Sequence, residues 1–353
     1  MIQAIWSAIA RARSSARCVE SASAVTSVAV ASTHRRRGVL RQMMEKDLAD
    51  SVERGECVSV LLASEYPIYG RFGFGPAVEG AEYQVRTEGL RFLRPSLGEV
   101  EMVDLATLRK EGPPVFEQFR RSQVGSIERD DAWWDRVLEQ VAVPGVEPGK
   151  GFRIVYRSPE GEVEGYARYG ADREWVGMRP NCTVRVSELV ALSPRAYQAL
   201  WEFLANLDLT TSIVAGDRPT DEVLPYLLAD ARLVTQARRW DFLWVRILDA
   251  PRALSGRRYA VEGRLVLEVV DDAGYAAGRY LLEGGPAGST CRDGDESADL
   301  TLPVTSLGAV YLGAAAFRTL LAAGALDEHS PGAVSRADAM FHEARAPWCT
   351  TWF

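Results

Sequence analysis

Four arginines and one glycine stand close together near the start of the chain, at Arg35, Arg36, Arg37, Gly38 and Arg41. A glycine in such a turn lets the backbone approach a ligand closely, and the first amides of a following helix point outward at its positive dipole end. That arrangement binds phosphate groups, and arginine side chains add charge-assisted hydrogen bonds to the phosphate oxygens. The pattern predicts a pyrophosphate site, and a solvated basic turn is the alternative.

Two strands and one helix must hold this turn in place. Strands are expected over residues 25–30 and 58–63, which are short apolar runs. The helix between them would end at Gly55, and its apolar side chains recur at helical spacing, namely at Leu40, Met43, Met44 and Leu48. A glycine-rich aromatic loop follows the second strand. A strand–helix–strand unit of this kind favours a buried pair of strands that are either parallel or splayed apart.

Two further blocks follow this unit. In residues 99–248, Ser193 and Pro194 open a helix as its N-cap and first residue. The other elements expected there are helices over 116–120 and 133–138 and strands over 151–156, 165–169, 184–192 and 242–248. The third block, from Pro251 on, is expected to hold strands over 264–270, 278–282 and 299–304, polar turns over 284–297 and helices over 306–312 and 314–321. The aromatic end, 346–353, is expected to be docked, because free chain ends are usually polar.

The composition is that of an ordinary globular protein. The chain has 353 residues, of which 47% are hydrophobic and 25% charged. No apolar run approaches the ~18 residues that a membrane-spanning helix needs. The net charge of -7 argues against a nucleic-acid partner. Residues 1–44 nevertheless carry seven arginines and a single acid, which suits a small anionic ligand.

Cysteine usage indicates a reducing compartment. The five cysteines are Cys18, Cys57, Cys182, Cys291 and Cys349. They are odd in number and far apart, and the three histidines form no cluster, so we expect neither a metal site nor a disulfide framework. A cytoplasmic protein is the expectation that follows. Residues 1–17 are rich in arginine, alanine and serine, a composition shared by organelle transit peptides and short surface helices.

The basic turn resembles a known signature. Arg35-x-x-Gly38-x-Leu40 is similar to the coenzyme A motif of GNAT N-acetyltransferases, written Q/R-x-x-G-x-G/A, with leucine at the last position. Two longer strings, Val-Ala-Val-Ala-x-Thr-His-Arg-Arg-Arg-Gly (28–38) and Ala-Ser-Glu-x-x-Ile-Tyr-Gly-Arg-Phe-Gly-Phe-Gly-Pro (63–76), resemble the enhanced intracellular survival (Eis) family of aminoglycoside-type acetyltransferases. That family also carries leucine there. The resemblance continues through 186–189 and 306–313 to Phe353 and covers about residues 19–353.

The resemblance implies a fold of the α/β (α+β) class in three parts. These are a partial GNAT acetyl-CoA-binding domain over residues 1–97, a second GNAT-like domain without coenzyme A over 98–248, and a sterol-carrier-protein-like domain over 249–353. It also implies a homohexamer. The activity implied is acetyl-CoA-dependent N-acetylation of an aminoglycoside-like or polyamine substrate, with acetyl-CoA as co-substrate and no metal.

The family's binding roles transfer to matched positions. Main-chain groups of Val28, Ala29 and Val30 would hold the pantetheine arm of the donor. The pyrophosphate would lie against Arg36, Arg37, Gly38, Val39, Leu40 and Arg41. The Ser-Glu pair that ends the next strand carries over to Ser64 and Glu65 as further cofactor-binding residues.

Two catalytic roles also follow from the resemblance. The tyrosine of Ile-Tyr-Gly, here Tyr69, would be the general acid, since acetyl transfer leaves a thiolate and a phenol with a pKa near 10 can supply its proton. The C-terminal carboxylate, here of Phe353, would be the general base. A free α-carboxyl has a pKa near 3.5, which an apolar pocket would raise. Simple packing is the alternative role for both aromatic rings.

The N-terminus departs from the family pattern. A GNAT domain places three strands and two helices before the Val-Ala-Val segment, which need roughly 60 residues at average lengths. Only 27 residues precede Val28. We therefore expect either an N-terminally truncated chain or a wrongly assigned start, and the missing part would line the amine pocket. The alternatives to catalysis are a remnant that acts only as an assembly or binding protein, and a lipid-binding scaffold built on the third domain.

Overall fold

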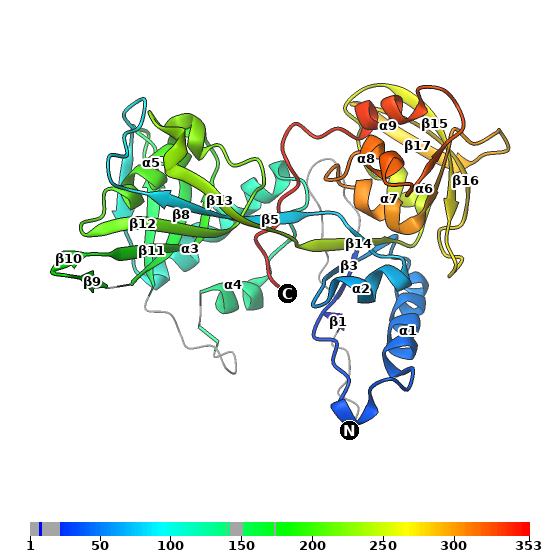
Figure 1. Cartoon of the computed structure of the whole chain (residues 1–353), viewed down its shortest axis with the longest axis horizontal. Coiled ribbons are helices and arrows are strands. Elements are labelled where there is room, and N and C mark those ends of the chain that lie inside the picture. The colour runs from blue at the N-terminus through cyan, green and yellow to red at the C-terminus, as the bar shows by residue number, and fades with distance from the viewer. Residues whose placement is uncertain (1–6, 9–21, 139, 142–150, 173) are drawn as a thin grey trace. The chain divides into compact units, whose positions relative to one another are not determined.

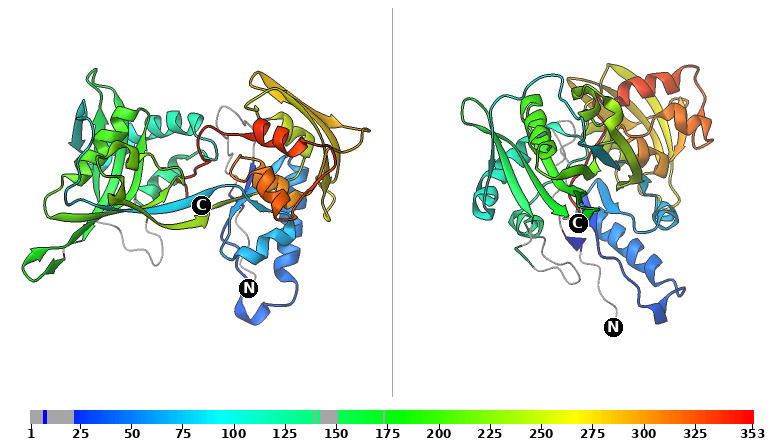
Figure 2. Two further views of the ribbon diagram at one scale, coloured as in Figure 1. Left: turned by 45° about the horizontal axis from the view of Figure 1, so that its top comes forward. Right: turned by 60° about the vertical axis from the view of Figure 1, so that its left-hand side comes forward.

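The computed structural model describes residues 7–8, 22–138, 140–141, 151–172 and 174–353. Cys18 and nearly all of the arginine-rich start lie outside the described residues. The chain forms two compact units, both mixtures of helices and strands (Figure 1, Figure 2). The first unit comprises Met1–Glu79, Gln123–Glu128 and Asp241–Phe353, and the second comprises Gly80–Ser122 and Arg129–Trp240. None of the described helices has both the length and the apolar character needed to cross a bilayer.

The first unit contains the predicted strand–helix–strand element. Its sheet has the strand order β1-β2-β3-β14-β4, with β1 (Ser7–Ala8), β2 (Ala22–Val25), β3 (Val58–Leu62), β4 (Gly75–Pro76) and β14 (Leu243–Ile247). Of the two expected arrangements, β2 and β3 adopt the parallel one, from the pair Ala22–Val58 to the pair Val25–Leu61. Helix α1 (Val39–Glu53) connects them and buries Met44 and Leu48 against the sheet. The β-α-β prediction is confirmed.

The first strand ends earlier than predicted. A strand was expected over 25–30, but β2 stops at Val25, and the chain turns at Ser27, whose φ is 55°. This left-handed backbone conformation is incompatible with a continuing strand. The apolar residues that suggested the strand therefore follow it as an irregular segment.

The strand expected over 242–248 does not close the second block. As β14 it pairs antiparallel with β3, where Leu243 lies opposite Leu62, and with β4. All five of its side chains are buried. A strand buried on both faces has no polar alternation, so its sequence gives no indication of which sheet it joins.

The last part of the first unit is a second five-stranded sheet, in the order β17-β16-β15-β18-β19. Its elements are β15 (Gly263–Val270), β16 (Gly278–Gly285), β17 (Gly288–Asp293), β18 (Leu300–Pro303), β19 (Asp327–Glu328), α6 (Ala250–Ser255), α7 (Val304–Val310), α8 (Phe317–Ala322) and α9 (Ala333–Phe341). Residues 284–297 were expected to be turns, which is wrong for β17. This strand lies at a sheet edge with mostly exposed polar side chains, and it therefore lacks the apolar pattern of a strand.

Two glycines let helix α7 lie directly on the first sheet. A Cβ at Gly75 would come 2.0 Å from the carbonyl oxygen of Thr305 and 2.7 Å from the amide nitrogen of Ala309. A Cβ at Gly308 would come 2.4 Å from the carbonyl oxygen of Val245. The backbones of α7 and of the first sheet thus touch with no side chain between them, which explains why glycine stands at positions 75 and 308.

Substituting Gly75 with alanine should therefore lower the free energy of unfolding by about 1–3 kcal/mol, since overpacking forces the backbones apart. Chemical denaturation of the variant and the parent protein measures this loss. Gly70→Ala is the matched control, because a Cβ at Gly70 meets nothing within 4 Å and the φ of Gly70 is -57°. Equal denaturation midpoints for both variants would contradict the close contact with α7.

The second unit is built on one seven-stranded sheet, in the order β13-β5-β12-β11-β8-β7-β6. Its elements are β5 (Glu79–Arg86), β6 (Glu99–Met102), β7 (Phe152–Arg157), β8 (Val163–Asp172), β11 (Cys182–Ala191), β12 (Thr210–Arg218), β13 (Val234–Asp241), α3 (Leu105–Ser122), α4 (Asp131–Val137) and α5 (Pro194–Ala205), with a separate hairpin β9 (Trp175–Val176) and β10 (Arg179–Pro180). β11 and β12 are parallel, and α5 connects them. This repeats the arrangement of β2, α1 and β3.

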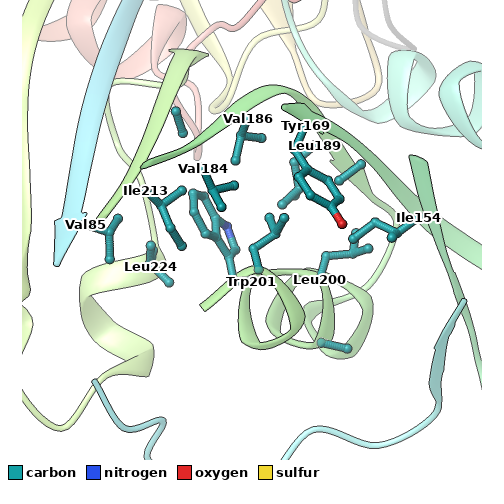
Figure 3. Packing of buried hydrophobic residues seen from close by; sticks show 14 of the residues in the cluster. Val85, Ile154, Tyr169, Val184, Val186, Leu189, Leu200, Trp201, Ile213 and Leu224 are labelled. Atoms are coloured by element: carbon teal, nitrogen blue, oxygen red, sulfur yellow. The ribbon is translucent and has the colours of Figure 1, made fainter. Parts of the chain in front are cut away.

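The core of the second unit lies between α5 and this sheet. Figure 3 shows Leu200 and Trp201 of α5 packed against Val184, Val186 and Ile213 of β11 and β12. Leu200 and Ile213 are fully buried. The predicted helix cap is confirmed, because the Ser193 hydroxyl accepts a hydrogen bond from the Ala196 amide at 3.2 Å.

Candidate functional site

Both segments predicted to bind the donor follow the carboxyl ends of parallel strands. Val28–Val30 comes after β2, and Ser64 to Tyr69 come after β3. The carboxyl ends of neighbouring parallel strands lie at one edge of a sheet, where α/β proteins usually bind their ligands. The topology therefore brings the predicted donor residues to one edge of the first sheet.

The segment Val28–Val30 offers its backbone to a ligand. After the turn at Ser27 it belongs to no strand, and its main chain forms no hydrogen bond with any residue that the structure describes. Val28 and Val30 are half-buried while Ala29 is exposed. Main-chain amides and carbonyls need partners, so an extended ligand with amide groups can pair here as a neighbouring strand would.

The basic turn leaves the start of α1 uncapped. Residues 31–38 are all exposed, and two of them have left-handed backbones, with φ of 61° at Arg36 and 77° at Gly38. No side chain caps α1, and its first turn contains no acidic residue. The amides of the first helical turn therefore face outward at the positive end of the helix, ready to accept an anion.

The arginines of this turn are available for such an anion. Among the described residues, no carboxylate lies within 4.0 Å of the side-chain nitrogens of Arg35, Arg36 or Arg37. Arg41 lies 4.0 Å from Glu45, and both side chains are mostly exposed, so this pairing contributes little. The turn thus concentrates positive charge beside free helix amides.

The corresponding helix start in the second unit is closed by its own chain. The Ser193 hydroxyl caps α5 and lies 2.5 Å from the Glu164 carboxylate. Past the last β11–β12 pair, buried Arg218 bridges the two strands by donating to the Leu189 carbonyl at 2.8 Å. Burial, followed by the charge of Glu222, raises the pKa of Tyr197, which bonds Glu222. The start of α5 is thus occupied by groups of its own chain, whereas the start of α1 is not.

Tyr69 belongs to an apolar cluster that residues of both predicted donor segments border. It ends the short helix α2 (Tyr66–Tyr69), is 5% exposed, and packs edge-on against Phe74 with ring centroids 6.4 Å apart. Val28 and Leu40 pack against the same apolar cluster. No described group hydrogen-bonds to the Tyr69 hydroxyl. The Tyr69 ring is thus held by packing in the cluster that Val28 also borders, and its hydroxyl bonds no described group.

The residues just before this helix are open to solvent. Ser64 and Glu65 are exposed at the end of β3, and the Glu65 carbonyl accepts the Ile68 amide at 3.2 Å, which closes the first turn of α2. Tyr66 is 60% exposed and packs on Trp244 at 4.9 Å. The polar pair therefore forms the rim of this sheet edge, with Tyr69 behind it.

The aromatic chain end is docked, as predicted. The Trp348 amide donates to the Val124 carbonyl at 2.8 Å, and Trp352 packs edge-on against Phe242 with ring centroids 4.9 Å apart. Phe242 directly precedes Leu243, which pairs with Leu62 at the end of β3. The last residues, including half-buried Phe353, thus reach the sheet edge that carries the donor segments.

Among the described residues, no three His, Cys, Asp or Glu side chains group as metal ligands. The cysteines at positions 57, 182, 291 and 349 are all buried. One charged residue near the turn after Tyr69, the buried Arg246, was not among the residues expected from the sequence. Its signal was present as a single arginine inside an otherwise apolar strand.

Comparison with known proteins identifies the domains and the family of the chain. Two family models described as acetyltransferase (GNAT) domain match residues 19–77 and 125–247, and one described as sterol carrier protein domain matches 250–350. The chain is 43% identical over 338 residues to an uncharacterized N-acetyltransferase of Streptomyces griseus, covering 93% of this chain and 81% of that protein. It is 37% identical over 327 residues to N-acetyltransferase Eis of Mycobacterium tuberculosis, covering 89% and 76%.

Solved structures show the same architecture. The crystal structure of Eis1 from Mycobacterium abscessus superposes with a TM-score of 0.86 at 34% identity, covering 97% of this chain and 85% of that one. Two GNAT domains followed by a sterol-carrier-like domain, in a mixed α/β fold, are therefore confirmed.

Proposed function

Because the chain belongs to the Eis family of GNAT N-acetyltransferases, we propose that it moves the acetyl group of acetyl-CoA to an amine of an aminoglycoside-like or polyamine acceptor. The observation that carries the proposal is the uncapped, arginine-rich start of α1 beside the unpaired segment Val28–Val30. The family relationship also leads us to infer a homohexamer.

The donor would lie along these groups in order. The backbone of Val28, Ala29 and Val30 pairs with the amides of the pantetheine arm. The pyrophosphate is held by the amides of Gly38, Val39 and Leu40 and by the side chains of Arg36, Arg37 and Arg41, through helix-dipole and charge-assisted bonding. Ser64 and Glu65, at the end of β3, would lie along one side of the donor.

The acetyl transfer needs one acid and one base. The Phe353 carboxylate takes a proton from the acceptor ammonium, which frees the nitrogen lone pair for attack on the thioester carbonyl carbon. As the new C–N bond forms, the C–S bond breaks and its electron pair stays on sulfur. The Tyr69 phenol gives that sulfur a proton, and the second proton lost by nitrogen restores the phenol.

Charge reversal at Arg36 tests the donor site. Losing one charge-assisted hydrogen bond costs ~1.5–3 kcal/mol, which corresponds to roughly 10- to 150-fold weaker binding, and the repulsion in Arg36→Glu adds to this. Isothermal titration with acetyl-CoA measures the change. Arg258→Glu is the control, because Arg258 is exposed in the sterol-carrier-like domain. This substitution changes the net charge of the protein by the same amount as Arg36→Glu. Equal affinity of both variants for acetyl-CoA would reject the assignment.

A further inference from the structure

We propose that the sterol-carrier-like domain positions the general acid, through a buried ion pair between Arg246 of β14 and Asp271 of the loop after β15. This inference rests on the proposed role of Tyr69. It gives the third domain a direct part in acetyl transfer, since a side chain of that domain would fix the turn that carries the catalytic phenol.

The ion pair is completely buried. The Arg246 side chain is 0% exposed and that of Asp271 is 3% exposed. One guanidinium nitrogen of Arg246 donates to both Asp271 oxygens at 2.8 Å, and another donates to the Ile247 carbonyl at 3.1 Å. Arg246 belongs to β14, and Asp271 directly follows β15, so the pair joins the GNAT sheet to the loop that leaves the sterol-carrier-like sheet.

The guanidinium of Arg246 lies directly against the turn that follows Tyr69. Gly73 has a φ of 83°, and a Cβ there would come 2.7 Å from the Arg246 guanidinium. The Gly73 amide bonds the Gly70 carbonyl at 3.0 Å, and the Phe74 amide bonds the Tyr69 carbonyl at 3.3 Å. Any movement of the guanidinium is therefore transmitted to the backbone that holds Tyr69.

The loop from the third domain is shaped to hold Asp271. Its carboxylate also accepts the amides of Ala273 at 3.2 Å and Ala276 at 2.9 Å. Tyr275 of the same loop lies 5.8 Å from the Arg246 guanidinium and packs against the apolar cluster that contains Tyr69. The loop thus contacts Arg246 through an ion pair and the cluster around Tyr69 through an aromatic ring.

Stability alone explains this arrangement poorly. Replacing a buried ion pair with apolar side chains of similar volume is often neutral or stabilising, because burying two charges is costly. The buried Arg246 Nε has no hydrogen-bond partner in the described structure, which adds to that cost. Unlike apolar packing, the ion pair with Asp271 fixes the Arg246 guanidinium in one position against Gly73.

The test is the double variant Arg246→Met/Asp271→Leu, which removes both charges and keeps an apolar volume. We expect the purified variant to bind acetyl-CoA with a Kd within about threefold of the parent. Its kcat should fall about 10- to 100-fold, because displacing a catalytic group by about 1 Å costs up to that much. The matched control is Arg218→Met/Glu222→Leu, a buried pair of the second unit, which should keep kcat.

A cycle with Tyr69→Phe separates this inference from the proposed function. If the pair acts through Tyr69, the double variant lowers kcat in the parent but adds nothing in the Tyr69→Phe background. A folded double variant with the parent's kcat, or equal losses in both backgrounds, would overturn the inference while leaving the acid role of Tyr69 intact. Unchanged kcat for Tyr69→Phe itself would instead reject the proposed acid, and this inference with it.

Asp271→Asn provides the same test if the double variant does not fold. The asparagine keeps the size of the side chain and can still accept from Arg246, but it removes the charge. We expect kcat to fall about 3- to 10-fold with KM for acetyl-CoA unchanged, as a small shift of the turn requires. A rise in KM without a change in kcat would contradict a role in positioning the acid.

Discussion

Tyr69→Phe should lower kcat for acetyl transfer by roughly 100- to 10,000-fold, the range that a positioned proton donor contributes. The thiolate of coenzyme A would then leave without its donor. The phenylalanine ring fills the same space in the buried cluster around Phe74, so the fold and the donor site should be kept. Steady-state kinetics with a polyamine acceptor, together with titration of acetyl-CoA, separate the loss of kcat from any loss of binding.

Tyr66→Phe is the matched control for this result. Tyr66 belongs to the same short helix, but it is 60% exposed and packs on Trp244. Its hydroxyl has no role in the proposed reaction, so kcat should stay within about twofold of the parent. Full activity of Tyr69→Phe, or equal losses for both variants, would remove Tyr69 from the reaction.

The backbone geometry around the residues proposed to bind the donor was predictable, because the signal is local. A glycine after consecutive arginines, followed by apolar residues at helical spacing, predicts an uncapped helix start, and α1 begins at Val39 with Gly38 as its left-handed N-cap. The parallel pairing of β2 with β3 was one of the two expected arrangements, since a helix lies between them. Both inferences use only neighbouring residues and known backbone geometry.

The remaining features depend on contacts between residues that are far apart along the chain, and the sequence alone does not show which of these residues meet. The left-handed turn at Ser27 changed the predicted strand into the irregular segment Val28–Val30. The apolar strand β14 could join either block, and it joined the sheet that contains β3. The bridging Arg218 in the second unit and the close approach of α7 to Gly75 likewise require three-dimensional neighbours.

The glycines of the second long motif illustrate this limit. Their pattern indicated the family, but their physical roles differ from one another. Gly73 leaves room for the Arg246 guanidinium, and Gly75 leaves room for the backbone of α7. A Cβ added at Gly70 would meet nothing within 4 Å. One string of similar residues thus combines a side-chain contact, a backbone contact and an open position.

Adding one glycine after Phe353 should lower kcat about 100-fold if the Phe353 carboxylate is the general base. The addition moves that carboxylate by up to ~3.5 Å, and misplacing a catalytic group by even about 1 Å can cost 10²-fold. The aromatic anchor stays in place, since Trp352 packs on Phe242 and Trp348 bonds Val124. Steady-state kinetics at fixed pH measure the loss, and titration of acetyl-CoA should show unchanged donor binding.

Phe353→Leu is the variant that separates base from packing. It keeps the carboxylate in place and only reduces an apolar side chain that is half-buried, so kcat should fall less than with the added glycine. If Phe353 served packing alone, the order would be reversed, because the glycine extension retains the ring and the leucine does not. A glycine-extended protein that keeps the parent's kcat would show that another group takes the proton from the acceptor amine. We expect the glycine extension to lower kcat more than Phe353→Leu does. Trp352 packs on Phe242, and the pairing of Leu243 with Leu62 places Phe242 at the end of β3, which Ser64 and Tyr69 follow.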